Sequence, residues 1–169
     1  MQYPIYSRVD ASPNGPILTE SFDFDFAEIP DGNIVIDGKV YGVYTLDSRL
    51  QLRLTRGSEY GWVKVYGQSM NASSPISIDD GDYILFIKDQ KLNHGEIVIA
   101  SLPDETGAGY RFVVKRCVID TRFSYEAILM SESTESHHKP LKPNKDAIII
   151  GKAVAVAKLN LDKVFKEEL

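Results

Sequence analysis

The sequence predicts an all-β domain, and two observations support this prediction. Aromatic residues make up 10% of the 169 residues, with 9 Tyr and 7 Phe, and this composition favours strands. Short apolar runs bounded by Gly, Asp or Asn recur along the chain, as is typical of antiparallel strands joined by tight turns. Hydrophobic residues reach 43%, enough for one domain with its own core. We therefore expect an all-β domain of antiparallel strands and hairpins.

The first 20 residues are expected to form an extended N-terminal arm or linker. Three prolines and an Asn-Gly pair interrupt this segment, and few apolar side chains accompany them. The folded domain is expected over residues 21–169. It begins with Ser21–Phe26, where Phe and Asp alternate strictly, so that the apolar side chains lie on one face of a half-buried strand.

Further strands are predicted from short apolar runs, and the turn sequences Asp-Gly-Asn and Asp-Gly separate the first of them into hairpins. In chain order these strands cover residues 34–36, 39–46, 51–56, 62–66, 82–87, 96–102, 110–119 and 148–156. Residues 132–143 are polar and contain His137 and His138, which we interpret as part of a solvated loop rather than as metal ligands. Asn160 and Asp162 are typical capping residues and predict a short C-terminal helix, Leu161–Leu169.

Composition excludes several functional classes. The formal net charge is −5 with no basic block, which disfavours a nucleic-acid-binding surface. The single cysteine, Cys117, cannot form an intrachain disulfide, and the three histidines lack zinc-site spacing, so neither a metal nor a cofactor is expected. The sequence lacks the pattern of a signal peptide and an apolar stretch of membrane-spanning length. We expect a cytoplasmic protein without a membrane contact.

Four segments in a fixed order carry a resemblance to a known family. They are Val65–Met70 (VYGQSM), Ile78–Asp82 (IDDGD), His94–Ala100 (HGEIVIA) and Val114–Arg116 (VKR). The sequence resembles the self-cleaving LexA-type repressor family, whose members carry a Ser-Met pair, a downstream Asp-Gly-Asp and a lysine in a Val-Lys-Arg strand. The resemblance covers roughly residues 60–156. The HGEIVIA run is also similar to the accessory subunit of the error-prone translesion polymerase.

The resemblance implies a LexA-like catalytic domain of curved antiparallel sheets and hairpins. It also implies a Ser-Lys dyad, in which Ser69 is the nucleophile and Lys115 the general base. Chemistry independent of the family agrees, because a lysine acts as a base only if burial lowers its pKa. Lys115 lies in the apolar run 112–118, where an inward-facing lysine is desolvated while Arg116 points to the opposite face. The alternatives are a turn serine after Gly67 and an exposed lysine on an amphipathic strand.

Other site features follow from the same resemblance. The backbone N–H groups of Gln68 and Ser69 would form the oxyanion hole, because the tetrahedral oxyanion needs donors that are already in place. Met70 is expected to form a wall of the site, and the Asp80-Gly81-Asp82 turn is expected to have no catalytic part. Relatives commonly have threonine at the position of Val113, where its hydroxyl helps to orient the amine, so this chain departs from the family pattern there.

Self-cleavage is implied by the family, with the aligned bond between Ala11 and Ser12. Ser12 replaces the glycine that is usual after this bond, and Pro13 restricts Ser12 to extended geometry. These departures, together with Val113, keep a second interpretation open. In that interpretation the chain is a regulatory or dimerisation module, or a polymerase accessory subunit, that has the same fold and does not cleave itself.

The leading interpretation is the C-terminal autoproteolytic and dimerisation domain of a LexA-like or phage-type transcriptional repressor, acting in the SOS or prophage-induction response. The resemblance implies a homodimer formed through the C-terminal strands and cleavage triggered by the RecA filament on single-stranded DNA. DNA would be contacted only through a helix-turn-helix domain, and this chain shows no recognition helix. A third interpretation, signal-peptidase-like processing, is disfavoured because no membrane anchor is expected.

Overall fold

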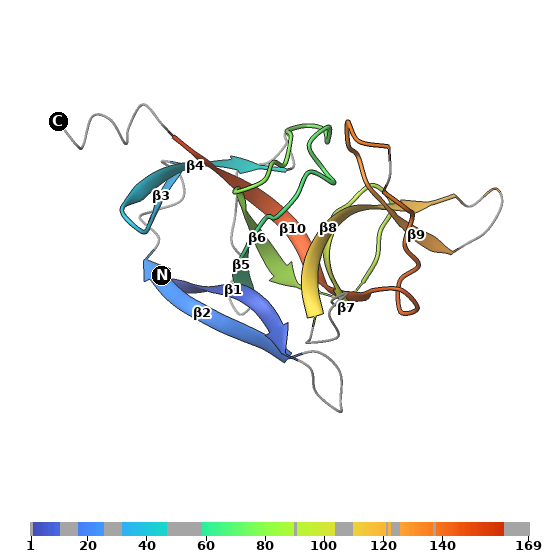
Figure 1. Cartoon of the computed structure of the whole chain (residues 1–169), viewed down its shortest axis with the longest axis horizontal. Coiled ribbons are helices and arrows are strands. Elements are labelled where there is room, and N and C mark those ends of the chain that lie inside the picture. The colour runs from blue at the N-terminus through green and yellow to red at the C-terminus, as the bar shows by residue number, and fades with distance from the viewer. Residues whose placement is uncertain are drawn as a thin grey trace.

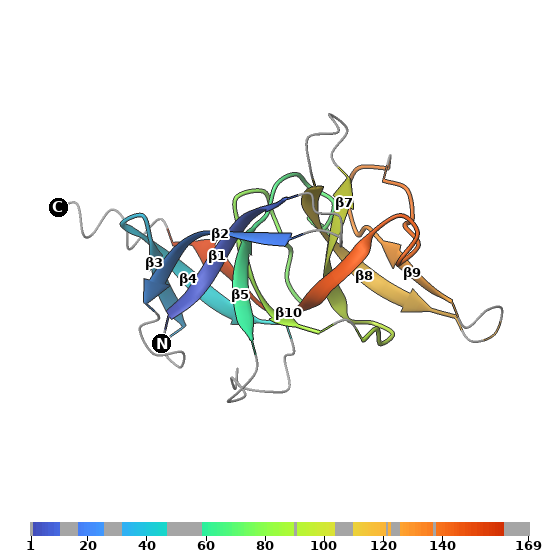
Figure 2. The ribbon, with the colours of Figure 1, turned by 90° about the horizontal axis from the view of Figure 1, so that it is seen from below.

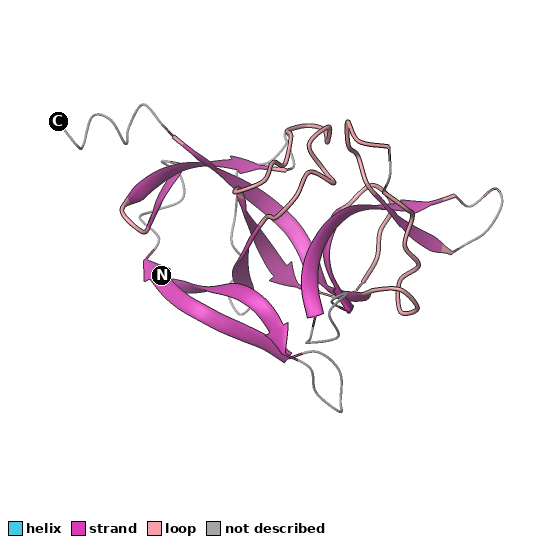
Figure 3. Cartoon of the chain, viewed as in Figure 1, coloured by secondary structure: helices cyan, strands magenta, loops and turns pink. Residues whose placement is uncertain are grey.

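The computed structural model describes residues 2–10, 17–25, 32–46, 59–89, 91–103, 110–120, 122, 126–136 and 138–160. Every regular element in these ranges is a strand (Figure 3), which confirms the all-β prediction. The predicted helix Leu161–Leu169 and the predicted strand 51–56 lie outside the described residues. Within the same ranges no helix has the length and hydrophobicity needed to cross a membrane.

The described residues contain ten strands, and all of them are hydrogen-bonded into one strongly curved sheet (Figure 1). Their bounds are β1 (Gln2–Asp10), β2 (Ile17–Asp25), β3 (Asn33–Ile36), β4 (Lys39–Thr45), β5 (Tyr60–Lys64), β6 (Tyr83–Lys88), β7 (Ile97–Pro103), β8 (Tyr110–Ile119), β9 (Ala127–Met130) and β10 (Ile148–Leu159). The strand order is β2-β1-β5-β6-β10-β7-β8-β9, and the β3–β4 hairpin joins the sheet through the pairing of β4 with β10.

Strand β10 connects the two ends of the molecule (Figures 1 and 2). Its first half pairs with β7 and its second half with β4, while β6 pairs along most of its length. At Gly151 a β-carbon would lie 2.3 Å from the carbonyl oxygen of Ile87, a separation that no side chain tolerates. The glycine therefore allows β6 and β10 to approach closely where β10 passes from one partner to the next.

The N-terminal segment pairs into the sheet. Strands β1 and β2 form an antiparallel hairpin, and β1 also pairs in parallel with β5 at Ile5 and Tyr6. A single further pairing joins Val9 of β1 to Tyr110 of β8. This hairpin includes most of the segment that the sequence predicts to be an extended arm, and residues 11–16 between its strands lie outside the described residues.

Three clusters of buried apolar side chains fill the interior. The first lies beneath the β3–β4 hairpin and contains Trp62, which is fully buried. The second contains Phe86, Met70 and Val114, and the third contains Cys117 and Leu129. The second cluster joins the loop that follows β5 to strand β8, so burial of apolar area brings these two distant segments together.

Candidate active site

The loop that follows β5 carries Ser69 and is held by the turn that precedes β6. The amide of Val65 donates to the Asp82 carbonyl at 2.7 Å, and the Gly81 amide donates to the Val65 carbonyl at 2.9 Å. Gly67 has a φ of +85°, a conformation that favours glycine, and its amide donates to the Asp80 carboxylate at 2.7 Å. The Asp80-Gly81-Asp82 turn therefore fixes the backbone just before Ser69.

The residue after Ser69 anchors the loop in the core. Met70 is 1% exposed and packs in the second cluster. Its carbonyl accepts hydrogen bonds from the amides of Ser73 and Ile78, each at 3.1 Å. Ser69 is thus held between a glycine turn and a buried methionine, so its side chain has a defined position.

Ser69 contacts strand β8, which carries Lys115. The half-buried Ser69 hydroxyl donates to the carbonyl oxygen of Val114 at 3.4 Å. Val114 precedes Lys115 directly, so the fold brings Ser69 into contact with the neighbour of Lys115 in the chain, although the two segments are distant in sequence.

Lys115 is buried, as its apolar surroundings in the sequence predict. The residue is 5% exposed, and its backbone pairs with that of Val98 in β7. Burial lowers the pKa of Lys115 to about 8, and the positive charge of Arg111 contributes to the same shift. Roughly a tenth of such amines are neutral at pH 7, so a base is available near physiological pH.

The hydrogen bond of the Lys115 amine goes to a residue that the sequence analysis did not identify. Nζ donates to the hydroxyl oxygen of Ser131 at 2.5 Å. Within the described parts of the chain, no hydrogen bond joins this amine directly to Ser69. Ser131 follows the end of β9. It meets Lys115 through the pairing of β8 with β9, and a local sequence pattern does not specify this pairing.

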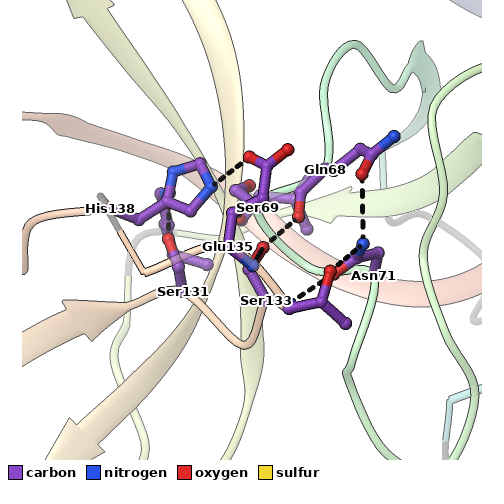
Figure 4. Close-up of polar contacts among 10 residues, drawn as sticks. Gln68, Ser69, Asn71, Ser131, Ser133, Glu135 and His138 are labelled. Carbon is purple, nitrogen blue, oxygen red and sulfur yellow. Dashed lines mark hydrogen bonds and ion pairs between the residues drawn. The ribbon is translucent and has the colours of Figure 1, made fainter.

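The segment after β9 also forms hydrogen bonds with the Ser69 loop (Figure 4). The Ser133 hydroxyl donates to the Gln68 carbonyl at 2.7 Å, and the Ala72 amide donates to the Glu132 carbonyl at 2.9 Å. Asn71 exchanges two hydrogen bonds with Thr134, both of 2.9 Å. We call residues 131–134 the clasp, because they contact both the lysine and the serine loop.

Arg116 lies on the face of β8 opposite Lys115, as the strand periodicity predicts, and contacts three other segments of the chain. Its guanidinium contacts the Glu132 carboxylate at 2.8 and 2.9 Å. It also donates to the carbonyls of Gly95 at 2.8 Å and Ser74 at 2.5 Å. The side chain is 18% exposed, so Arg116 is less solvated than the sequence suggested.

The amides of Gln68 and Ser69 are the donors of the predicted oxyanion hole. Among the residues that the structure describes, no hydrogen bond from these two amides is found. The oxyanion hole stays a prediction.

The remaining polar residues near the turn have structural contacts. Lys158 donates to Asp79 at 2.8 Å and to Asp82 at 2.6 Å. The hydrogen bond from Lys158 lowers the pKa of Asp79, whereas burial outweighs the same contact and raises the pKa of Asp82. Burial also raises the pKa of the Cys117 thiol, which makes a thiolate nucleophile unfavourable there.

Other predicted positions are less informative. His138 pairs with Glu135 at 3.4 Å, while His137, Ala11 and Ser12 lie outside the described residues. The described ranges contain no group of three or more His, Cys, Asp or Glu side chains that could hold a metal ion.

Comparison with known families agrees with this geometry. Residues 26–154, more than half of the chain, match the family described as peptidase S24-like. The chain belongs to the peptidase S24-like family. A LexA-like Ser-Lys peptidase domain is therefore present, and its family supports a serine peptidase kind of activity. No curated protein matches the chain in a search of such proteins.

The matched range of this peptidase S24-like domain includes Ser69, Lys115 and the clasp. Sequence reasoning missed Ser131 and Asp80 as residues that hold the site. Asp80 lies in a motif that the sequence shows clearly, but its contact with the Gly67 amide depends on the packing of two loops. No local sequence pattern predicts a role for Ser131, because a serine after a short strand is common in loops.

Proposed function

We propose that the protein is a serine peptidase that uses Ser69 as nucleophile and Lys115 as general base. The observation that carries the proposal is the buried Lys115 amine, with a pKa of about 8, on the strand against which the Ser69 hydroxyl rests. A lysine with this pKa takes up a proton near neutral pH and can release it again within one turnover.

The chemical step balances with these groups alone. The neutral Lys115 amine accepts the Ser69 proton while Oγ attacks the peptide carbonyl, and the Gln68 and Ser69 amides stabilise the oxyanion. Collapse of the tetrahedral intermediate breaks the C–N bond, and the lysine ammonium gives its proton to the leaving amine. Water then hydrolyses the ester by the same route, which regenerates Ser69 and neutral Lys115.

The contact with Ser131 is compatible with this role. A neutral amine has two N–H donors and one lone pair, so it can donate to Ser131 while it accepts a proton from Ser69. In the ground state the Ser69 hydroxyl donates to Val114 instead. Rotation about one serine torsion redirects that proton, and we propose that this side-chain change directs it to Lys115.

The substrate that we propose is the chain's own N-terminal segment, cut at the Ala11–Ser12 bond. Strand β1 leads towards this bond and pairs with β8, the strand of Lys115, at Val9. The proposed context is a homodimeric cytoplasmic repressor of the SOS or prophage-induction response, with cleavage triggered by the RecA filament and DNA bound through another domain. The alternative, a module that does not cleave itself, is favoured by Ser12 and Val113.

The test is intact mass against time at several pH values for wild type, Ser69→Ala and Lys115→Ala. We expect wild type to lose an N-terminal fragment, with a new N-terminus at Ser12 and a half-maximal rate near pH 8. Both variants should remain intact at every pH. The exposed residues Ser136 and Lys142 provide matched controls as Ser136→Ala and Lys142→Ala, which should cleave like wild type.

Two outcomes would contradict the proposal in different ways. Cleavage that persists in Ser69→Ala or Lys115→Ala would exclude the dyad. A stable mass in wild type at pH 10 would exclude self-cleavage and favour the alternative module.

A further inference from the structure

Ser131 lies directly across from Lys115 in the sheet. In the β8–β9 pair, Arg116 is opposite Met130 and Cys117 is opposite Leu129. The same register continued by one residue places Ser131 opposite Lys115. Cys117 and Leu129 are both fully buried, so strand alternation puts Lys115 and Ser131 on that same inward face.

The Ser131 hydroxyl is the acceptor that the Lys115 amine uses. Nζ lies 2.5 Å from Oγ, and the lysine side chain is almost completely shielded from solvent. A buried ammonium without an acceptor is strongly unfavourable, so this contact determines where the amine points. Val113, two residues before the lysine on the same face, offers no hydroxyl for this purpose.

The clasp fixes the position of Ser131 relative to Ser69. Glu132, Ser133 and Thr134 each hydrogen-bond to the loop that carries Ser69, within three residues of Ser131. A displacement of the serine loop is therefore transmitted to the residue that holds the lysine. Ser131 and the loop of Ser69 are thus linked through the contacts of the three residues that follow Ser131.

We propose that Ser131 is a positioning residue that holds the Lys115 amine in the orientation needed to accept the Ser69 proton. The inference deepens the proposed peptidase function and rests on it. Ser131 acts through Lys115 and forms no bond to substrate. Its hydroxyl oxygen accepts one N–H of the amine, which leaves the amine lone pair free for the proton transfer.

The charged groups near Lys115 have partners of their own, apart from Arg111, and Ser131 is not one of these partners. Arg111 on the same strand is the charge that contributes to the lowered pKa of Lys115. Arg116 and Glu132 pair with each other at 2.8 Å, and Arg116 faces the other side of β8. Glu96, next to β7, is bound to Lys152 at 3.0 Å, and Glu135 pairs with His138. None of these pairs includes Ser131.

The first experiment measures the pKa of Lys115 directly by NMR titration of ¹³C-labelled lysine. It uses the full chain with Ser69→Ala, so that no cleavage occurs during the titration. Adding Ser131→Ala should lower the pKa of Lys115 by about one unit, because the ammonium loses its acceptor. Ser131→Thr keeps a hydroxyl and should leave the pKa near that of the parent. Ser136→Ala is the matched serine control.

The second experiment measures reaction with a fluorophosphonate probe, and self-cleavage, against pH in chains that retain Ser69. Ser131→Ala should lower the plateau rate about 10- to 100-fold and move the half-maximal pH downward. Ser131→Thr should restore both. Ser133→Ala removes a clasp contact without touching the lysine, so it should lower the rate without moving the half-maximal pH.

The outcomes separate this inference from the proposed function. An unchanged Lys115 pKa in Ser131→Ala, or the probe attached to Ser131 instead of Ser69, would overturn the positioning role. A wild type that neither cleaves nor reacts, with the Lys115 pKa still shifted by Ser131→Ala, would refute the peptidase function and leave the contact supported.

Discussion

The buried charge of Lys115 is expected to destabilise the folded protein at neutral pH, so that Lys115→Met should increase its stability. Burial lowers the pKa of this amine from 10.5 to about 8. Each pKa unit is worth about 1.4 kcal/mol, so the charged amine costs the folded state about 3 kcal/mol below pH 8. Methionine has a similar length and no charge. We expect a gain of about 2 kcal/mol, because the Ser131 hydroxyl loses its partner.

The pH dependence of this gain is determined by the two pKa values. Below pH 8 the amine is protonated in both the folded and the unfolded chain, so the full cost is present. Between pH 8 and 10.5 the folded chain has released its proton while the unfolded chain still holds it, and the cost falls as pH rises. The advantage of Lys115→Met should therefore be largest at pH 7 and should disappear near pH 11.

The assay is urea unfolding at pH 7, 9 and 10.5, with both proteins in the Ser69→Ala background to prevent cleavage. Lys158→Met is the matched control. Lys158 contacts Asp79 and the buried Asp82, and these contacts raise its pKa despite its partial burial. Its contribution to stability is present below pH 10.5 and is lost only as pH rises through the raised value. Lys158→Met should therefore lower stability at pH 7, by about 2 kcal/mol.

A Lys115→Met protein that is less stable than its parent at pH 7 would refute the reasoning. A gain of equal size at pH 7 and pH 10.5 would also refute it, because better packing alone, without a change in charge, has no such pH dependence.

Two further substitutions test how the fold supports the site. Asp80→Ala removes the acceptor of the Gly67 amide, so we expect the rate of self-cleavage to fall about tenfold while urea unfolding shows a loss under about 1 kcal/mol. Asp80→Asn keeps an oxygen acceptor and should retain most of the rate; equal rates for both variants and wild type would contradict this role. Gly151→Ala places a methyl group against the Ile87 carbonyl, and we expect a loss of about 2 to 3 kcal/mol in urea unfolding. A loss under about 0.5 kcal/mol would show that β6 and β10 separate easily.

Local patterns were sufficient to predict most of the strands. The predicted strand 110–119 coincides with β8. Residues 34–36 and 39–46 differ from β3 and β4 by one residue at one end, and 82–87 is shifted by one residue from β6. Strand β9 was missed, because it has only four residues and two of its apolar side chains, Ile128 and Met130, are exposed. Strand β1 was missed because the prolines and the Asn-Gly pair of the first 20 residues favoured an irregular segment, although β1 pairs with β2 along most of its length.

The sequence by itself determined the all-β class, the family and the inward direction of Lys115. These follow from properties that a short segment carries, namely strand alternation, turn residues and four motifs in a fixed order. A lysine within an apolar strand must face the core whenever its neighbours on that face do.

Only the tertiary structure decided which groups meet at the site. The contacts of Ser131 with Lys115, of Ser69 with Val114 and of Asp80 with Gly67 join segments separated by 13 to 45 residues. Their partners are selected by strand register and by burial of apolar side chains such as Met70, and neither is a property of a local segment. The residues of the proposed dyad could therefore be named from the sequence, whereas the groups that contact them are known only from the folded structure.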